Sequence, residues 1–131
     1  MINILVVDDS AVMRSMIIKT LKMCGIKLGE IYQAANGLEG LKQLDNNWVD
    51  LVLVDLNMPV MDGEQMIDRL RQNPLTKDLP VVVVSTESSQ SRMEILEKKS
   101  SGFVHKPFNP EVIKRIIESV VGVVNVNETS A

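Results

Sequence analysis

Short apolar runs recur along the chain and are separated by amphipathic stretches. The runs Ile2–Val7, Leu51–Val54 and Leu79–Val84 are almost continuously apolar and rich in Val, Ile and Leu. Strands that are covered on both faces, as in a parallel sheet, have this composition. Two weaker runs, Lys27–Ala35 and Phe103–Val104, complete a set of five predicted strands.

Helical periodicity fills the gaps between these runs. The first predicted helix follows Ser10, a favourable N-cap residue, and ends before Gly25, a favourable C-terminal stop. Its apolar stripe, which we expect to face the core, consists of Val12, Met13, Met16, Ile17 and Leu21. The other helices are predicted to start near Asn36, Asp62, Glu87 and Asn109.

The alternation of strands and helices is (βα)5. Right-handed crossovers would place helices on both faces of a parallel sheet, so we predict a doubly wound α/β domain. Periodicity does not give the strand order. We expect one domain over residues 1–123 and a disordered tail at 124–131.

Composition narrows the class of protein. The chain has 131 residues, of which 45% are hydrophobic and 24% charged, with a net charge of −3. This is typical of a globular domain, and the scattered basic residues argue against a nucleic-acid surface. No signal peptide and no long apolar segment is present, so we expect no membrane insertion and a cytoplasmic location. The single Cys24 excludes an intrachain disulfide and fits a reducing compartment.

Polar side chains follow four of the five predicted strands. Asp8 and Asp9 follow the first strand, Asp55 the third, Ser85-Thr86 the fourth and Lys106-Pro107 the fifth. All strands of a parallel sheet end at the same edge, where ligands of such folds bind. A lone aspartate after a strand usually caps a turn or a helix, but the combination at one edge favours a functional site.

The three carboxylates would crowd together if the first and third strands were neighbours, because hydrogen-bonded strands lie about 5 Å apart. Such crowding would raise the pKa of at least one carboxyl group. A hard divalent cation with oxygen ligands would relieve it, and Mg²⁺ suits a site with few protein ligands. The sequence therefore predicts a magnesium site at this edge.

Four motifs in this order resemble the receiver domain of two-component response regulators. They are VVDDS at 6–10, VDLNMPVMDG at 54–63, VVST at 83–86 and HKPF at 105–108. The resemblance extends from Ile4 to about Val121 and is greatest to the single-domain, CheY-like regulators of chemotaxis. It implies a flavodoxin-like sandwich with the strand order 2-1-3-4-5.

The resemblance also implies residue roles. Asp55 would accept the phosphoryl group, Asp9 would bind Mg²⁺ directly, and Asp8 would act mainly through water. The backbone carbonyl of Asn57 would complete the protein ligands. Lys106 and the backbone of Thr86 would bind phosphoryl oxygens, Ser85 and Phe103 would act as switch residues, and Pro107 would follow a cis peptide bond.

The implied function is that of a signalling switch rather than a conventional enzyme. The domain would catalyse its own Mg²⁺-dependent phosphorylation by a histidine kinase and its own dephosphorylation. A target protein would bind the face that includes Arg92, Ile95, Lys99, Phe103, His105 and the helix Glu111–Val120. A phosphatase is a further candidate partner, and we expect a monomer or a weak, phosphorylation-dependent dimer.

Several alternatives stay open at this point. A relay intermediate, a phosphate sink and a phosphorylation-independent pseudo-receiver all share this fold. A haloacid-dehalogenase-like phosphatase would need a second aspartate where this chain has Asn57, and a nucleotide or flavin binder would need a glycine-rich first turn instead of DDSAVM. We expect His105 to be an exposed or half-buried strand residue and Trp48 to pack at the edge of the core.

Overall fold

One parallel sheet of five strands forms the centre of the protein. The computed structural model describes the backbone of residues 1–130 and the side chains of residues 1–121. The strands lie in the order β2-β1-β3-β4-β5, which confirms the predicted topology. Their bounds are β1 (Ile2–Val7), β2 (Leu28–Ala34), β3 (Leu51–Val54), β4 (Val81–Ser85) and β5 (Gly102–His105).

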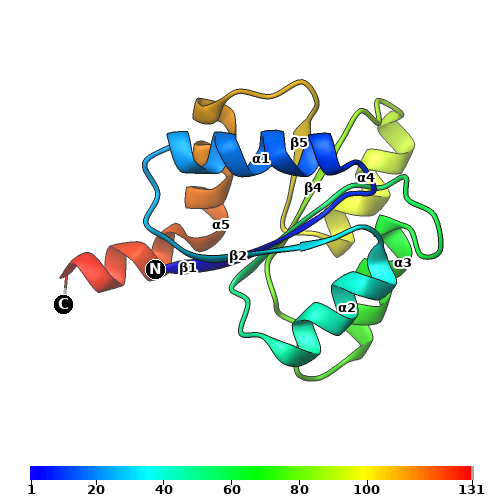
Figure 1. The fold of residues 1–131 in the computed structure, drawn as a ribbon, viewed down its shortest axis with the longest axis horizontal. Coiled ribbons are helices and arrows are strands. Elements are labelled where there is room, and N and C mark those ends of the chain that lie inside the picture. Colours follow the sequence, from blue (N-terminus) through cyan, green and yellow to red (C-terminus); the bar gives the residue numbers. More distant parts are fainter. Residues whose placement is uncertain (131) are drawn as a thin grey trace.

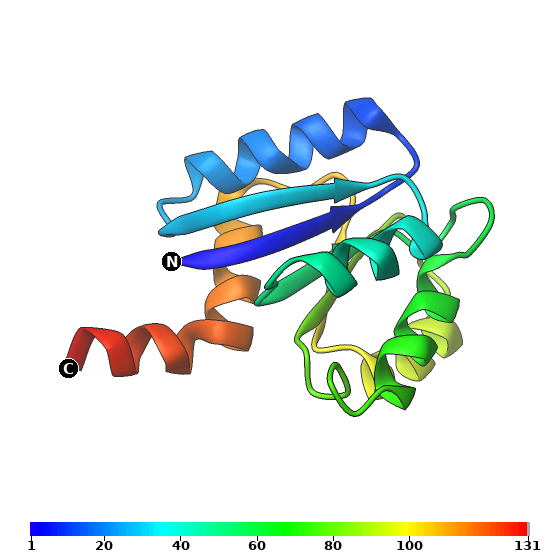
Figure 2. The same cartoon turned by 60° about the horizontal axis from the view of Figure 1, so that its bottom comes forward.

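Helices cover both faces of the sheet (Figures 1 and 2). They are α1 (Ala11–Met23), α2 (Gly37–Asn46), α3 (Gly63–Gln72), α4 (Gln90–Lys99) and α5 (Pro110–Ser130). One core cluster joins α1 and α5 to the sheet and includes Val6 and Ile17. The other joins α2, α3 and α4 to the opposite face and includes Val7 and Met66. Successive residues of β1 thus point to opposite faces of the sheet. Both faces are buried, as expected for a doubly wound domain.

The helix ends follow the local sequence as predicted. The side chains of Ser10, Asn36 and Asp62 each accept a hydrogen bond from a backbone N–H in the first turn of α1, α2 and α3. Asp62 and Gln65 form a complete capping box. Gly25 has a φ of 78°, so it supplies the left-handed residue that ends α1.

Two predictions about packing were wrong, one of them in part. In the predicted stripe of α1, Ile17 and Leu21 are buried and Met13 packs against the core, but Val12 and Met16 are 71% and 53% exposed. Trp48 is 78% exposed instead of packing at the core edge. Its indole N–H donates to Asp50 Oδ1 at 3.0 Å.

The predicted disordered tail, residues 124–131, lies outside the residues whose side chains are described, so its disorder stays a prediction. Within the described part of the chain, no helix combines the length and apolar character needed to cross a bilayer.

Candidate metal and phosphoryl site

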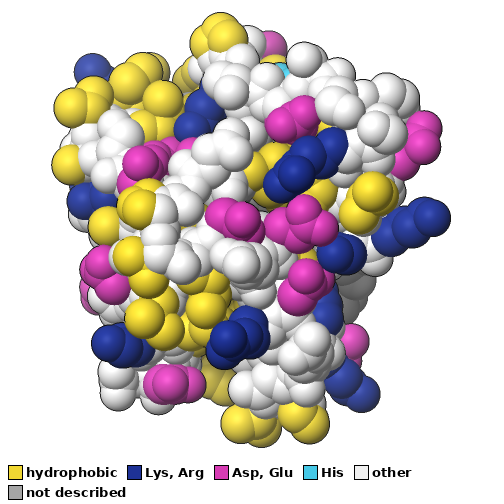
Figure 3. All heavy atoms as spheres, turned by 90° about the vertical axis from the view of Figure 1, so that its right-hand side faces the viewer, with side chains coloured by type: hydrophobic (Ala, Val, Ile, Leu, Met, Phe, Trp, Pro, Cys, Tyr) yellow, Lys and Arg dark blue, Asp and Glu magenta, His cyan; other side chains and the backbone are white. Residues whose placement is uncertain are grey.

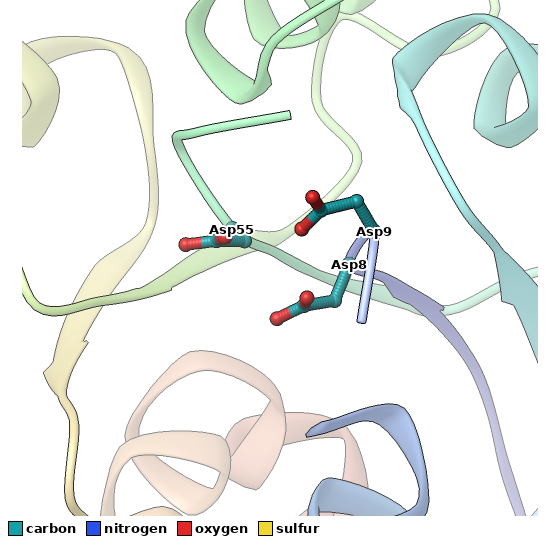
Figure 4. Close-up of side chains that lie close together, drawn as sticks. All are labelled: Asp8, Asp9 and Asp55. Carbon is teal, nitrogen blue, oxygen red and sulfur yellow. The ribbon is translucent and has the colours of Figure 1, made fainter. Parts of the chain in front are cut away.

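The register of β1 and β3 brings Asp8, Asp9 and Asp55 together. Val7 pairs with Val54, and the N–H of Asp55 donates to the carbonyl of Val7 at 2.9 Å. The residues that follow these strands therefore share the carboxyl edge of the sheet. One carboxylate oxygen from each aspartate lies within 4.8 Å of the other two. Figure 4 shows the three carboxyl groups side by side at the ends of the two strands.

Lys106 approaches the cluster from the end of β5. Its ammonium lies 3.0 Å from Asp8 Oδ2 and 3.5 Å from Asp55 Oδ1. The N–H of Lys106 donates to the carbonyl of Ser85, and the Lys106–Pro107 peptide bond is cis. The side chains of Lys106, Asp8 and Asp55 are 12%, 2% and 12% exposed, so their charges interact with little screening by water.

The surroundings of Asp55 shift the pKa of its carboxyl group. Burial raises the pKa of its carboxyl group above the usual 3.8. The Lys106 ammonium opposes this shift, whereas the neighbouring Asp8 charge adds to it. Crowding by carboxylates therefore contributes to the raised pKa of Asp55, as expected, but burial is the larger cause.

The two carboxylates that follow β1 have different surroundings. Asp8 is buried, and its two carboxylate oxygens accept hydrogen bonds from the N–H of Ser10 and from Lys106. Asp9 is exposed, and its carboxylate accepts no hydrogen bond from the residues whose side chains are described. Asp8 is therefore fixed by the protein, while Asp9 has both oxygens free to bind a ligand.

The remaining predicted site residues lie around this edge. Ser85 is fully buried at the end of β4, and its Oγ accepts a hydrogen bond from the N–H of Glu87 at 3.2 Å. Thr86 and Asn57 are exposed in the loops that follow β4 and β3. The structure gives no hydrogen bond between Ser85 and Asp55 among the described side chains.

Two residues that support the site were not predicted from sequence. A Cβ at Gly63 would overlap the main-chain oxygen of Asp55. Glycine at this position therefore lets the first turn of α3 lie against the backbone of Asp55. Arg14 Nη1 donates to the main-chain oxygen of Asp8 at 2.6 Å. The only sequence signal for the contact between Gly63 and Asp55 was a glycine directly after the N-cap Asp62. The contact between Arg14 and Asp8 had no sequence signal.

The predicted target-binding face is only partly free. Ile95 is 49% exposed, His105 is exposed, and the rings of Phe103 and His105 pack with centroids 4.8 Å apart. In contrast, Lys99 binds Glu64 and Asp68 of α3, each at 3.0 Å, and Arg92 lies 3.3 Å from Glu64. We name these four residues the α3–α4 ion cluster. Figure 3 shows acidic and basic side chains intermingled on the side of the molecule that carries α3 and α4.

The chain belongs to the response regulator receiver domain family, whose sequence profile matches residues 4–118. It is 34% identical over 122 residues to the chemotaxis protein CheY1 of Helicobacter pylori, covering 92% of this chain and 97% of that protein. It is also 36% identical over 118 residues to part of the sensor histidine kinase CheAY of the same species, covering 88% of this chain and 14% of the kinase.

Solved structures agree with this assignment. The chemotaxis protein CheY4 of Vibrio cholerae superposes with a TM-score of 0.81 at 32% identity, covering 92% of this chain and 98% of that chain. The fold and the strand order are therefore those of a CheY-like receiver. Family membership favours this class over the phosphatase and the nucleotide-binding alternatives.

Proposed function

We propose that this receiver accepts a phosphoryl group from a histidine kinase onto Asp55 with the help of Mg²⁺, and that it dephosphorylates itself. The observation that carries the proposal is the position of the Asp55 carboxylate. It ends a buried strand, lies 3.5 Å from the Lys106 ammonium, and shares a cluster of oxygen ligands with Asp8 and Asp9. A structural cap would need none of these neighbours.

The donor set fits Mg²⁺. Three carboxylates face one ammonium, so two negative charges stay uncompensated at the site, and a divalent cation would balance them. We propose that Asp9 and Asp55 bind the ion directly together with the main-chain carbonyl of Asn57. Asp8, whose two oxygens already accept hydrogen bonds, would act mainly through water. When bound, Mg²⁺ would neutralise charge on the phosphoryl oxygens.

The protein's own groups account for the remaining chemistry. Asp55 would attack phosphorus as a carboxylate and form an acyl phosphate, while the phosphohistidine of the donor leaves as the imidazole. Lys106 would pair with one phosphoryl oxygen and the backbone N–H of Thr86 with another. Phosphoryl transfer depends mainly on such positioning and charge stabilisation, so a rigid site is the main requirement. Hydrolysis of the acyl phosphate would end the signal.

We propose Ser85 and Phe103 as the residues that pass on the signal. Ser85 Oγ, which accepts a hydrogen bond from Glu87 N–H, would donate to the phosphoryl group, and the loop before α4 would follow. Phe103 lies half-buried on the next strand and could then repack. The change would shift the population of two arrangements of the α4-β5-α5 face and thereby alter the binding of a target.

The similarity to CheY proteins supports a role as a regulator of chemotaxis. We propose that the protein acts in the cytoplasm as a monomer or a phosphorylation-dependent weak dimer. The similarity to part of CheAY supports a histidine kinase as the phosphoryl donor. A phosphorelay intermediate or a phosphate sink is the second candidate, because both use the same acceptor site.

The test uses acetyl phosphate as a small-molecule donor. Wild-type protein should gain one phosphoryl group by intact mass in the presence of Mg²⁺ and none with EDTA, and Asp55→Asn should gain none. Asp62→Asn, which alters a helix-capping carboxylate outside the cluster, serves as the control and should be labelled like wild type. Mg²⁺-dependent labelling of Asp55→Asn would contradict the assignment.

A further inference from the structure

Arg14 connects the acidic loop to the neighbouring strand. Its side chain, half-buried on the first turn of α1, donates from Nη1 to the main-chain oxygen of Asp8 at 2.6 Å. It also donates from Nε to Gln33 Oε1 at 3.0 Å. A charge-assisted hydrogen bond of this length is among the strong ones in proteins, and the planar guanidinium can make both contacts at once.

The second anchor of Arg14 is itself held in place. Gln33 lies in β2, where it pairs with Val6 of β1. Its main-chain oxygen accepts a hydrogen bond from Gln43 Nε2 of α2 at 3.1 Å. A continuous chain of contacts therefore runs from α2 through β2 and Arg14 to the peptide that joins Asp8 to Asp9.

This peptide sets the direction in which the Asp9 side chain leaves the backbone. The carboxylate of Asp8 is fixed by Ser10 and Lys106, but the carboxylate of Asp9 accepts no hydrogen bond from the described side-chain range. Among the described contacts, Asp9 is therefore restrained through its backbone, because Arg14 binds the carbonyl on its N-terminal side.

We propose that Arg14 is a positioning residue that pre-orders Asp9 for divalent cation binding. The inference rests on the proposed function, because it assumes that the acidic cluster binds Mg²⁺. Arg14 touches neither the cation nor the phosphoryl group; it acts through the Asp8 carbonyl. Groups that orient metal ligands in this way typically change metal affinity by about 10- to 100-fold when removed.

Charge and positioning predict opposite results at Arg14. Arg14 is a cation that contacts the main-chain oxygen of Asp8, so its charge alone disfavours a second cation at the acidic cluster. Removing the charge would therefore strengthen Mg²⁺ binding if charge were its only role. Losing the bridge between Asp8 and Gln33 would weaken binding, because Asp9 would need to be ordered when the ion binds.

The experiment compares Arg14→Gln and Arg14→Lys with wild type and with Lys19→Gln. Lys19 is an exposed lysine on the same helix, so Lys19→Gln removes the same charge without breaking the bridge. Mg²⁺ affinity is measured by calorimetry without any phosphoryl donor. Amide hydrogen exchange of residues 8–10 is measured in the metal-free protein.

We expect both Arg14 variants to bind Mg²⁺ roughly tenfold more weakly and to exchange the amides of residues 8–10 faster. Lys19→Gln should bind Mg²⁺ at least as well as wild type. The positioning role would be overturned if Arg14→Gln bound Mg²⁺ more tightly than wild type while Arg14→Lys bound it equally well. It would also be overturned if both Arg14 variants matched wild type in Mg²⁺ affinity and in amide exchange. If wild type itself binds no Mg²⁺, the proposed function fails as well. If wild type binds Mg²⁺ and the Arg14 variants do not differ from it, only the role of Arg14 is refuted.

Discussion

The ammonium of Lys106 lies 3.0 Å from the carboxylate of Asp8, although 98 positions separate the two residues in the chain. The contact joins the end of β1, the first strand in the chain, to the end of β5 across β3 and β4, because all strands end at one edge. It also leaves a cation within reach of Asp55. The site is therefore assembled by topology, and its charges depend on one another.

Replacing Lys106 should destabilise the protein at neutral pH. Lys106→Met leaves the buried carboxylates of Asp8 and Asp55 without their cation, and breaking a buried ion pair typically costs roughly 3–5 kcal/mol. We expect a smaller loss, of about 1–3 kcal/mol, because Asp9 opens the site to water. Urea unfolding in EDTA measures it. Lys98→Met, an exposed lysine on α4, is the control, and an equal loss in both variants would contradict the account.

Asp55 should make the metal-free protein less stable as the pH rises. Because its folded-state pKa is raised, the native state keeps the proton more readily than the unfolded state does. The cost of ionising Asp55 is absent below the usual value of 3.8, grows as the pH rises through the raised pKa, and persists above it. Asp55→Asn should therefore be more stable than wild type in EDTA at about pH 7, with a smaller difference at about pH 4.

The matching control for this pH dependence is Asp45→Asn, which alters an exposed carboxylate on α2. Its stability relative to wild type should change little between the two pH values. Added Mg²⁺ should stabilise wild type by about 2.7 kcal/mol at a hundred times its Kd and should stabilise Asp55→Asn less. A stability difference between Asp55→Asn and wild type that shrinks with rising pH would refute the burial argument.

Gly63 should tolerate no side chain without movement of the site. An alanine there would overlap the main-chain oxygen of Asp55, so the turn between β3 and α3 must shift. We expect Gly63→Ala to lose about 1–3 kcal/mol of stability and to bind Mg²⁺ more weakly. Gly40→Ala is the matched control, because its Cβ would meet side chains rather than backbone, namely the end of Met66 and a methyl group of Val7. The gain in helix propensity would offset this crowding. Equal effects of the two substitutions would count against the steric argument.

The α3–α4 ion cluster should contribute little to global stability but should restrain α4. Leu96 is the buried residue of that helix, and Ser89 makes no side-chain cap. The Lys99 ammonium donates to the carboxylates of Glu64 and Asp68, and these hydrogen bonds raise the pKa of Lys99. Glu64→Gln should cost under about 1 kcal/mol, an effect that disappears at about 1 M salt, while amide exchange in α4 accelerates. Glu97→Gln, exposed on the same helix, should leave α4 exchange unchanged.

The sequence was sufficient to predict features that depend on local pattern. The apolar run before Asp55 defines a strand, Asp62 defines a helix start, and the order of the motifs places their polar residues at one edge. These features follow from periodicity, capping chemistry and the geometry of parallel sheets.

Features that depend on how elements meet were beyond the sequence pattern. Val12 and Met16 have the spacing of a core stripe, but the angle at which α1 packs leaves them in water. The contact of Arg14 with the Asp8 carbonyl needs the distance between α1 and the end of β1. The ion pairs of Lys99 likewise depend on how α4 lies along α3, which no single-helix pattern encodes.

The most direct test of the central claim locates the phosphoryl group. Protein labelled with acetyl phosphate and Mg²⁺ is reduced with borohydride, which converts an aspartyl phosphate into homoserine, and its peptides are then sequenced by mass spectrometry. The account predicts homoserine at residue 55, with unmodified Asp8 and Asp9, and none in an EDTA control. Homoserine at residue 8 or 9, or a stable phosphate on a serine or threonine with Asp55 intact, would contradict it.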